Sequence, residues 1–271
     1  MSKKLRTISQ IGFFILIGLI AVNHTLAESG QPIPLIGTAS FHAICPFGGV
    51  EALFAFLRYD VMIPKIHESA FVILGIILFI SILIGPVVCS YACPLGSIQE
   101  WVGKIGRKIF AKKYNHFIPY KYDRYLRYLR YVSLAFTVYL TTNSLKLVFL
   151  EVDPYYALFH FWSDEVTLGG LIVLAIVLLS SLFIERPWCK YACPFGAVVG
   201  LTNFLRIFKL KRNASTCIDC GLCDQSCPMN IKISDKVTVT NHQCIACNAC
   251  TSDQSCPIND TVVLTAGKAK G

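Results

Sequence analysis

Charged residues are scarce in this sequence of 271 residues. Asp, Glu, Lys and Arg together make up 15% of it, whereas soluble proteins of ordinary composition carry about 25%. Apolar residues make up 54%, and the mean hydropathy is +0.56. This shortage of charge excludes an ordinary soluble protein and indicates a chain that lies largely in a membrane.

Two further absences narrow the range of functions. The apolar stretches contain almost no ionisable residues, whereas transport pathways through a membrane usually need them. No segment resembles a DNA-binding motif, and the basic residues behind the net charge of +9 lie beside apolar stretches, as the positive-inside rule expects. A transporter and a nucleic-acid partner are therefore both disfavoured.

Four apolar stretches are long enough, or nearly so, to cross about 30 Å of hydrocarbon at 1.5 Å per residue. They cover residues 8–27, 69–88, 131–150 and 166–184. The first also resembles a signal peptide, because Lys3 and Lys4 precede an apolar run that ends in a small residue, Ala27. Cleavage there would leave the orientation of the other stretches unchanged.

The distribution of Lys and Arg predicts the orientation of these spans. Basic residues concentrate at the N-terminus, between the second and third stretches, and after the fourth. The opposite loops hold only Arg58, Lys65 and Lys146. We therefore expect a multi-pass protein of a prokaryotic cytoplasmic (inner) membrane, with both termini in the cytoplasm.

Eight of the thirteen cysteines fall in two spaced runs near the C-terminus. In such runs three closely spaced thiolates hold one [4Fe–4S] cluster, and the last cysteine of each run serves the other cluster. The second run has five residues rather than three before its last cysteine. The expected ligands are Cys217, Cys220, Cys223 and Cys256 for one cluster, and Cys244, Cys247, Cys250 and Cys227 for the other.

Other uses of these eight cysteines fit the pattern less well. Zinc ribbons close a site with two CxxC pairs and rarely carry a third cysteine and a Cys-Pro at this spacing. Disulfides require an oxidising compartment, whereas the expected topology places this segment in the reducing cytoplasm. The pattern resembles that of two-cluster bacterial ferredoxins over about residues 213–260, which indicates one-electron transfer.

A second set of cysteines lies in a motif that occurs twice. Cys89-Ser-Tyr-Ala-Cys93-Pro recurs one hundred residues later as Cys189-Lys-Tyr-Ala-Cys193-Pro, each time at the inner end of an apolar stretch. Two helix pairs of the same orientation indicate parallel repeats about an axis along the membrane normal. The four thiols are compatible with a third iron–sulfur cluster, with two redox-active dithiols, or with simple packing of small residues.

Polar residues of the outer loops form candidate sites for a quinone head group. Such a site needs a hydrogen-bonding residue and a carboxylate that takes up protons. The candidates are His42 with Glu51, and Asp153 with His160. Cys45 is a lone cysteine on the same side, where a buried thiol in a turn, a cofactor ligand and a bond to a partner protein are all compatible with the sequence.

With these motifs together, the chain resembles the NapH-type membrane polyferredoxins, which are quinol dehydrogenase membrane components, and the membrane domains of NosR. The resemblance rests on the four apolar stretches, the two CxxxCP motifs and the two C-terminal cysteine runs. It implies electron transfer between the quinone pool and redox partner proteins. The chain lacks the large flavin-binding domain of NosR, so that role is not implied.

The expected fold is an all-α integral membrane bundle with a C-terminal ferredoxin-like α+β segment. The bundle comprises residues 1–212, with four transmembrane helices in two parallel repeats (about 8–112 and 124–212). Residues 213–260 form the two-cluster segment, and residues 261–271 form a flexible tail.

The expected function is that of an electron-transfer subunit in a membrane complex, associated with the lipid bilayer, the quinone pool and redox partner proteins. One alternative is a thiol–disulfide relay through the CxxxCP cysteines. Another is an iron–sulfur redox sensor or assembly factor. The sequence leaves open whether the chain itself completes an enzymatic reaction.

Overall fold

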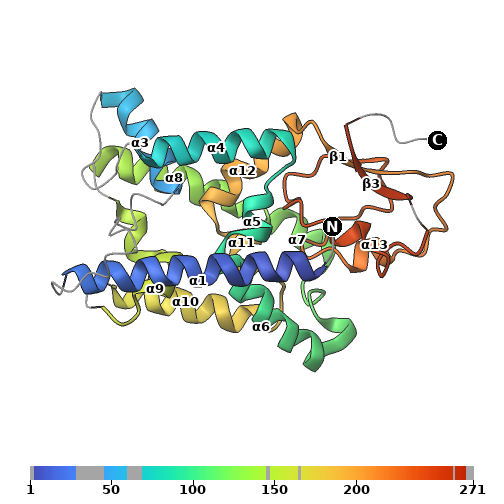
Figure 1. The fold of residues 1–271 in the computed structure, drawn as a ribbon, viewed down its shortest axis with the longest axis horizontal. Helices are drawn as coiled ribbons and strands as arrows, with labels where there is room; N and C mark the ends of the chain where they lie inside the picture. Colours follow the sequence, from blue (N-terminus) through green and yellow to red (C-terminus); the bar gives the residue numbers. More distant parts are fainter. Residues whose placement is uncertain are drawn as a thin grey trace.

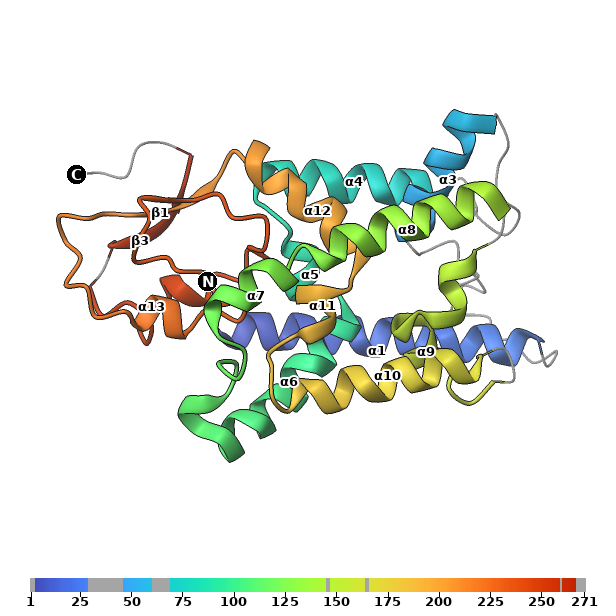
Figure 2. The ribbon, with the colours of Figure 1, turned by 180° about the vertical axis from the view of Figure 1, so that it is seen from behind.

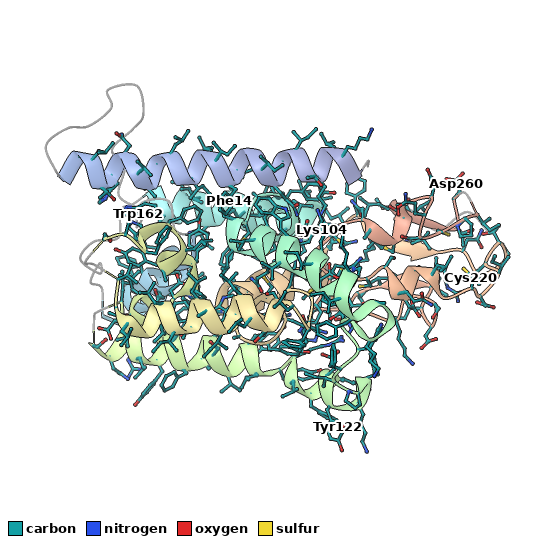
Figure 3. All side chains as sticks on the ribbon, turned by 90° about the horizontal axis from the view of Figure 1, so that it is seen from below. Phe14, Lys104, Tyr122, Trp162, Cys220 and Asp260 are labelled. Carbon is teal, nitrogen blue, oxygen red and sulfur yellow. The ribbon has the colours of Figure 1, made fainter. Side chains whose placement is uncertain are left out.

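The structure is a computed structural model, and it describes residues 3–28, 46–59, 69–144, 147–163, 166–258 and 260–266. Figure 1 shows a helical part with a smaller part at one end, which holds the labelled strands and the C-terminus. The view from behind in Figure 2 shows the same division. In Figure 3, Trp162 lies near one end of the molecule and Cys220 near the other. The fold is thus mostly helical.

The first half of the chain contains a long helix followed by shorter ones. These are α1 (Lys3–Glu28), α3 (Pro46–Tyr59), α4 (Ser69–Leu83), α5 (Val87–Tyr91), α6 (Pro94–Phe110) and the 3-10 helix η1 (Ala111–Lys113). Helix α4 ends before Gly85, whose φ of 100° is accessible mainly to glycine. Pro86 follows and cannot continue a helix, so the chain turns directly ahead of Cys89.

The second half of the helical part also consists of a series of helices. Its elements are α7 (Tyr120–Leu126), α8 (Leu129–Ser144), the 3-10 helix η2 (Val148–Val152), α9 (Pro154–His160), α10 (Leu168–Ser181), α11 (Pro187–Tyr191) and α12 (Pro194–Leu205). Thr167 caps the start of α10, because its hydroxyl accepts a hydrogen bond from the backbone N–H of Gly170 at 3.2 Å. The last turn before α11 passes through Arg186 in the left-handed conformation, with φ of 52°.

Helices of the two halves pack across one another. Helix α4 packs on α12, and α10 packs on α6. Helix α3 packs on α8, and α9 packs on α1. Elements at corresponding places in the two halves therefore make corresponding contacts, and the two CxxxCP motifs lie between the halves.

Helix α1 meets the criteria of length and composition for crossing a membrane, over residues Lys4–Ala27, and no other helix among the described residues does so. Helices α4, α10 and α12 are apolar but shorter. The stretches expected at 69–88, 131–150 and 166–184 form helices that end at Leu83, Ser144 and Ser181. The stretch expected at 69–88 ends early because the Gly-Pro pair at residues 85–86 interrupts the helix.

Three antiparallel strands connect the C-terminal part to the helices. They are β1 (Lys209–Arg212), β2 (Thr238–Val239) and β3 (Val262–Thr265), and the order in the sheet is β2-β1-β3. Leu210 of β1 lies opposite Val239 on one side and Leu264 on the other. The C-terminal part also contains the short helix α13 (Leu222–Gln225) and the 3-10 helix η3 (Ala249–Thr251).

This sheet sets the two ends of the C-terminal part. Helix α12 ends at Leu205 and β1 begins at Lys209, so the strand-bearing part begins before residue 213. The expected flexible tail begins with a strand instead, because Val262 is buried and Leu264 packs against the same core. The strand-bearing part therefore extends from residue 209 to residue 265.

Candidate metal centres and the central cavity

The first cysteine set surrounds a small cavity in the C-terminal part. It is lined by Cys217, Cys220 and Cys223 of the first run and by Cys256 of the second. The loop between the first cysteines bends through Gly221, whose φ of 67° favours glycine. Three cysteines from one tight loop and one from a distant run therefore line the same cavity.

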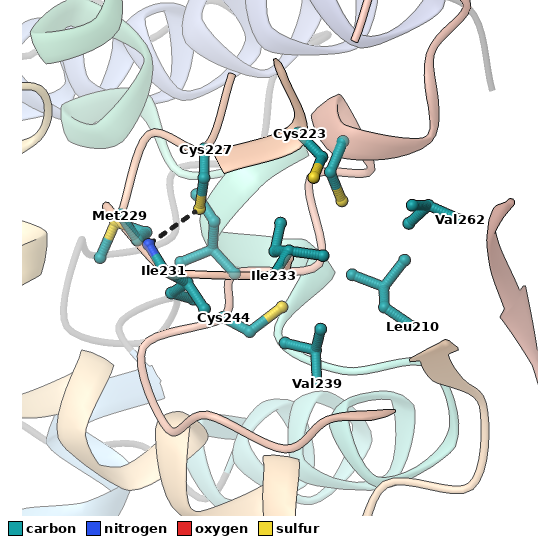
Figure 4. Packing of buried hydrophobic residues seen from close by; sticks show 11 residues of the cluster. Leu210, Cys223, Cys227, Met229, Ile231, Ile233, Val239, Cys244 and Val262 are labelled. Atoms are coloured by element: carbon teal, nitrogen blue, oxygen red, sulfur yellow. Dashed lines mark hydrogen bonds between the residues drawn. The ribbon is translucent and has the colours of Figure 1, made fainter. Parts of the chain in front are cut away.

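The second set surrounds another small cavity, lined by Cys244, Cys247, Cys250 and Cys227. Figure 4 shows Cys227 and Cys244 within the apolar core of this part, together with the hydrogen bond from the backbone N–H of Ile231 to the Cys227 sulfur at 3.4 Å. The two cavities thus exchange their fourth cysteines.

A compact turn accommodates the two extra residues that precede Cys256. Residues after η3 fold back on themselves, with the backbone N–H groups of Ser255 and Cys256 both donating to the carbonyl of Ser252, at 2.7 and 2.8 Å. The two extra residues therefore leave Cys256 beside the first cysteine set. In the part of the chain that the structure describes, no three His, Cys, Asp or Glu side chains are placed to hold one metal ion.

Each CxxxCP motif forms a corner between two helices. Cys89 lies in α5, and Cys93 is the N-cap of α6, whose first residue is proline. Cys189 and Cys193 hold the same positions in α11 and α12. Proline suits the first position of a helix, because the missing N–H would have no partner there.

All four CxxxCP cysteines line one cavity between the two halves, with a volume of about 270 Å³. Burial and, to a smaller extent, the nearby Cys189 raise the pKa of the Cys93 thiol to about 11. Burial also raises the pKa of Cys89 and Cys193. Thiolates at these positions therefore require compensation by a metal or another cation.

Side chains that the sequence did not single out surround these cysteines. The amide of Gln99 lies 3.7 Å from the Cys189 sulfur. Arg186, which is fully buried, donates to the carbonyl of Cys89 at 2.6 Å and to Glu100 at 2.6 Å. Glu100 also pairs with Arg6 of α1. The sequence carries one sign of these contacts: charged residues occur within a few positions of each CxxxCP motif in an otherwise apolar chain.

A second buried cation lies within the second CxxxCP motif. Lys190 is 1% exposed, and its Nζ lies 3.1 Å from Asp123. Burial lowers the pKa of Lys190 to about 8, although the Asp123 carboxylate raises it. The charge of Lys190 also acts on Cys227 of the second ferredoxin set. A cation therefore lies near both groups of sulfur atoms.

The C-terminal part is held against the helices by buried hydrogen bonds. Asn203 of α12 donates to the carbonyl of Cys244 at 2.8 Å, and Arg130 of α8 donates to the carbonyl of His242 at 2.8 Å. A Cβ at Gly200 would collide with both Arg130 and His242. Glycine therefore allows the close approach of the two parts.

The central cavity extends from the start of α9 to the C-terminal part. Asp153 and Tyr155 line it at one end, and His242, Cys244 and Ile245 line it at the other. Cys244 and Ile245 also line the second ferredoxin cavity, and Cys89 packs against the core of the C-terminal part. The CxxxCP set and the second ferredoxin set are therefore neighbours.

The structure brings together two of the four expected quinone-site residues in a different combination. Glu51 is 3% exposed and accepts a hydrogen bond from the Thr141 hydroxyl at 2.7 Å. Burial raises its pKa to about 7, the Thr141 hydrogen bond lowers it, and the charge of Asp153 raises it. Burial likewise raises the pKa of Asp153 to about 6. Glu51 and Asp153 are thus electrostatically coupled.

The remaining outer-loop candidates are placed differently. His160 is buried and stacks on the ring of Tyr156 at 4.2 Å between centroids, and its Nδ1 lies 3.2 Å from the Tyr156 carbonyl. His160 thus contacts its own helix through Tyr156, and its combination with Asp153 stays a prediction. His42 and Cys45 lie outside the described residues.

Comparisons with known proteins connect these sites to a family. A family described as "4Fe-4S binding domain" matches residues 66–113 and 166–213, and each stretch contains one CxxxCP motif. No solved structure matches the chain.

Three relatives place the chain further. An uncharacterized protein of Methanocaldococcus jannaschii is 34% identical over 77% of this chain and 82% of its own length. The putative electron transport protein YccM of Escherichia coli is 31% identical over 78% of this chain, which spans about three fifths (61%) of that protein. The ferredoxin-type protein NapH of Haemophilus influenzae is 27% identical over 65% of this chain and 61% of its own length. The chain therefore belongs to the NapH- and NosR-like family of ferredoxin-type iron–sulfur proteins.

Proposed function

We propose that the chain is a membrane-anchored electron-transfer subunit, which passes electrons between the quinone pool and a redox partner protein. The observation that carries this proposal is the adjacency of the cysteine sets. The central cavity and the second ferredoxin cavity share Cys244 and Ile245. Sulfur-lined sites therefore adjoin one another from the helices to the second ferredoxin cavity, and the first ferredoxin cavity lies in the same C-terminal part.

In this proposal each small cavity holds one [4Fe–4S] cluster. The ligands are the four cysteines that line it, which are Cys217, Cys220, Cys223 and Cys256, and Cys244, Cys247, Cys250 and Cys227. Each cluster, when bound, supplies a one-electron carrier. The protein contributes the crossed loops and backbone donors such as the N–H of Ile231 toward Cys227.

The four CxxxCP cysteines are proposed to hold a third cluster. The family match to a 4Fe-4S binding domain covers both CxxxCP motifs and ends before Cys217, which supports this assignment. A thiol–disulfide relay at the same residues is less favourable, because reactive thiols need a low pKa and access to solvent. Here burial raises the pKa of the Cys93 thiol instead.

The membrane placement is also part of the proposal. Helices α1, α4, α8 and α10 run side by side in Figures 1 and 2, and each exposes large apolar side chains. Val72, Phe136 and Leu179 are all 62% exposed, which favours contact with lipid. We infer that these four helices span the membrane in two repeats, with the C-terminal part on the cytoplasmic side.

The test is anaerobic mixing of the purified protein with menaquinol. Reduction of the clusters, seen as bleaching of their visible absorption, is the expected result. The Cys193→Ser variant should lose the central cluster and with it the fast reduction of the two others. Clusters that no quinol reduces would refute the quinone role. Reduction at an unchanged rate in the variant would refute the relay through the CxxxCP site.

A further inference from the structure

Three arginines near the cysteine sets are almost completely buried. Arg130 is 2% exposed, Arg206 is 1% exposed and Arg186 has no exposed surface. Moving a charged group out of water has a large cost in free energy unless an opposite charge lies beside it. Each of these arginines therefore needs a negative charge close by.

Arg186 has such a partner within the chain, whereas Arg130 and Arg206 do not. The Arg186 guanidinium lies 2.6 Å from the Glu100 carboxylate. Among the described residues, no carboxylate lies within ion-pairing distance of Arg130 or Arg206. Two cations in the interior therefore lack a carboxylate there.

The N–H groups of these two arginines are also incompletely paired. Arg130 donates to the carbonyl of His242 at 2.8 Å, and Arg206 donates to the carbonyl of Phe208. The Nε of Arg130 and the Nη2 of Arg206 nevertheless have no hydrogen-bond partner within the ranges that the structure describes. Backbone carbonyls satisfy some of the donors but bring no net charge, so both guanidinium charges stay uncompensated.

Both guanidinium groups lie beside a cysteine set. The Nη1 of Arg206 lies 3.7 Å from the Cys244 sulfur of the second ferredoxin set. Gly85 makes room for this nitrogen, because a Cβ at Gly85 would come within 2.7 Å of it. Arg130 lines the central cavity, and its charge acts on Cys89 of the CxxxCP set. The two uncompensated charges are thus directed at sulfur atoms.

A [4Fe–4S] cluster with four thiolate ligands supplies the missing negative charge when it is bound, since the thiolates outweigh the positive charge of its iron–sulfur core. Reduction adds one electron and makes the cluster more negative. A buried cation beside it therefore stabilises the reduced form more than the oxidised form. The reduction potential rises as a result, because net charge and hydrogen bonds to the sulfurs set it.

From these observations we propose that Arg130 and Arg206 are the counter-charges of the electron carriers where the helices meet the C-terminal part. Arg130 raises the reduction potential of the CxxxCP site, and Arg206 raises that of the second ferredoxin site. Both are positioning residues, because they act on the carriers without being ligands. This inference rests on the proposed function for the presence of clusters, and it adds the residues that hold an electron at this junction.

The test is an anaerobic redox titration of the full chain in detergent, with dithionite as the reductant and electron paramagnetic resonance as the readout. Arg206→Gln should lower the midpoint potential of the second ferredoxin cluster by about 59 mV, which is a tenfold change in a one-electron equilibrium. Arg130→Gln should lower the potential of the CxxxCP cluster by a similar amount. The first ferredoxin cluster is the internal reference, because neither arginine lines its cavity, and its potential should stay unchanged.

Further variants separate the effect of charge from that of structure. Arg206→Lys and Arg130→Lys keep the positive charge but lose the planar fork of donors, so their potentials should stay close to those of the original protein. Arg124→Gln is the matched control, because it removes an exposed arginine of the neighbouring helix α7, and it should shift no potential. If Arg206→Gln loses the second cluster, retention of that cluster in Arg206→Lys would support the counter-charge, and its loss in both variants would overturn it.

The outcomes also separate this inference from the proposed function. Unchanged potentials in the two Gln variants, or equal shifts in the Gln and Lys variants, would overturn the role of the arginines while leaving electron transfer intact. The expected shifts, in a protein whose clusters menaquinol does not reduce, would uphold the role of the arginines and overturn the proposed function.

Discussion

Glu51 provides a prediction whose size follows from its surroundings. The carboxyl group is 3% exposed on α3, and it accepts a hydrogen bond from the Thr141 hydroxyl. Burial raises its pKa from an ordinary value of 4.5 to about 7, and the charge of Asp153 adds to this effect. The folded protein therefore favours the neutral acid, and ionisation of Glu51 destabilises the fold.

The sign of the pH dependence follows directly. Between pH 4.5 and pH 7 the folded state binds more protons at this site than the unfolded state does, so stability falls as the pH rises through this window. Above pH 7 the full cost is present, which is about 3 kcal/mol at 1.36 kcal/mol for each tenfold change in proton affinity. Since Glu51 is almost completely buried, solvent screening does not reduce this figure much.

The variant Glu51→Gln keeps the shape and the hydrogen-bond acceptor but cannot ionise. At pH 8 it should be more stable than the original protein by up to about 3 kcal/mol, and at pH 4.5 the two should be equal. The assay is denaturant unfolding of the detergent-solubilised protein, followed by tryptophan fluorescence at both pH values. The original protein, measured at both pH values, is the reference. A difference that is the same at pH 4.5 and pH 8 would refute the reasoning.

Three further changes test the packing and the sulfur environment. Gly106→Ala pushes a methyl group into the backbone that follows α10, so we expect a loss of about 1–3 kcal/mol or more in unfolding free energy. Gly75→Ala is the control, because Gly75 has open space around it, and this variant should unfold as the original protein does. Glu100→Gln leaves the buried Arg186 without its carboxylate and should cost about 3–5 kcal/mol, seen as a lower unfolding midpoint; an unchanged midpoint would contradict this ion pair. Gln99→Leu removes the amide near a CxxxCP sulfur and should lower the midpoint potential of the central cluster in a redox titration, whereas an unshifted potential would exclude this contact as a tuning interaction.

The sequence predicted the crossed grouping of the ferredoxin cysteines, and the structure places the same residues around two cavities. The grouping was predictable because cysteine spacing on tight loops is a local property. The ligand assignment itself stays a prediction until metal is measured. The convergence of Cys89, Cys93, Cys189 and Cys193 on one cavity agrees with the idea of a shared site at the junction of the halves.

Long-range features were harder to predict. Nothing local in the sequence indicates that Arg186 turns back toward Cys89 and Glu100, since this depends on the packing of α6 against α10. The outer carboxylates were expected to combine with His42 and His160. Glu51 and Asp153 act on each other, because α3 and η2 both pack on α8, and the combinations with the two histidines stay predictions.

The length of the apolar stretches was also a limited guide. Hydropathy extended the second stretch past Gly85, where the backbone cannot remain helical. Hydropathy also gave no sign of how the chain continues after α12. This helix is apolar, and it leads into the sheet through β1 rather than along the bilayer surface.

The most direct test of the account is the iron content of the anaerobically purified protein and of its Cys89→Ser, Cys193→Ser double variant. Three four-iron clusters predict about twelve iron atoms per chain in the original protein and about eight in the double variant, with the electron paramagnetic resonance signals of the two ferredoxin clusters retained. An equal iron content in the two proteins, or a colourless protein that contains zinc in place of iron, would contradict it.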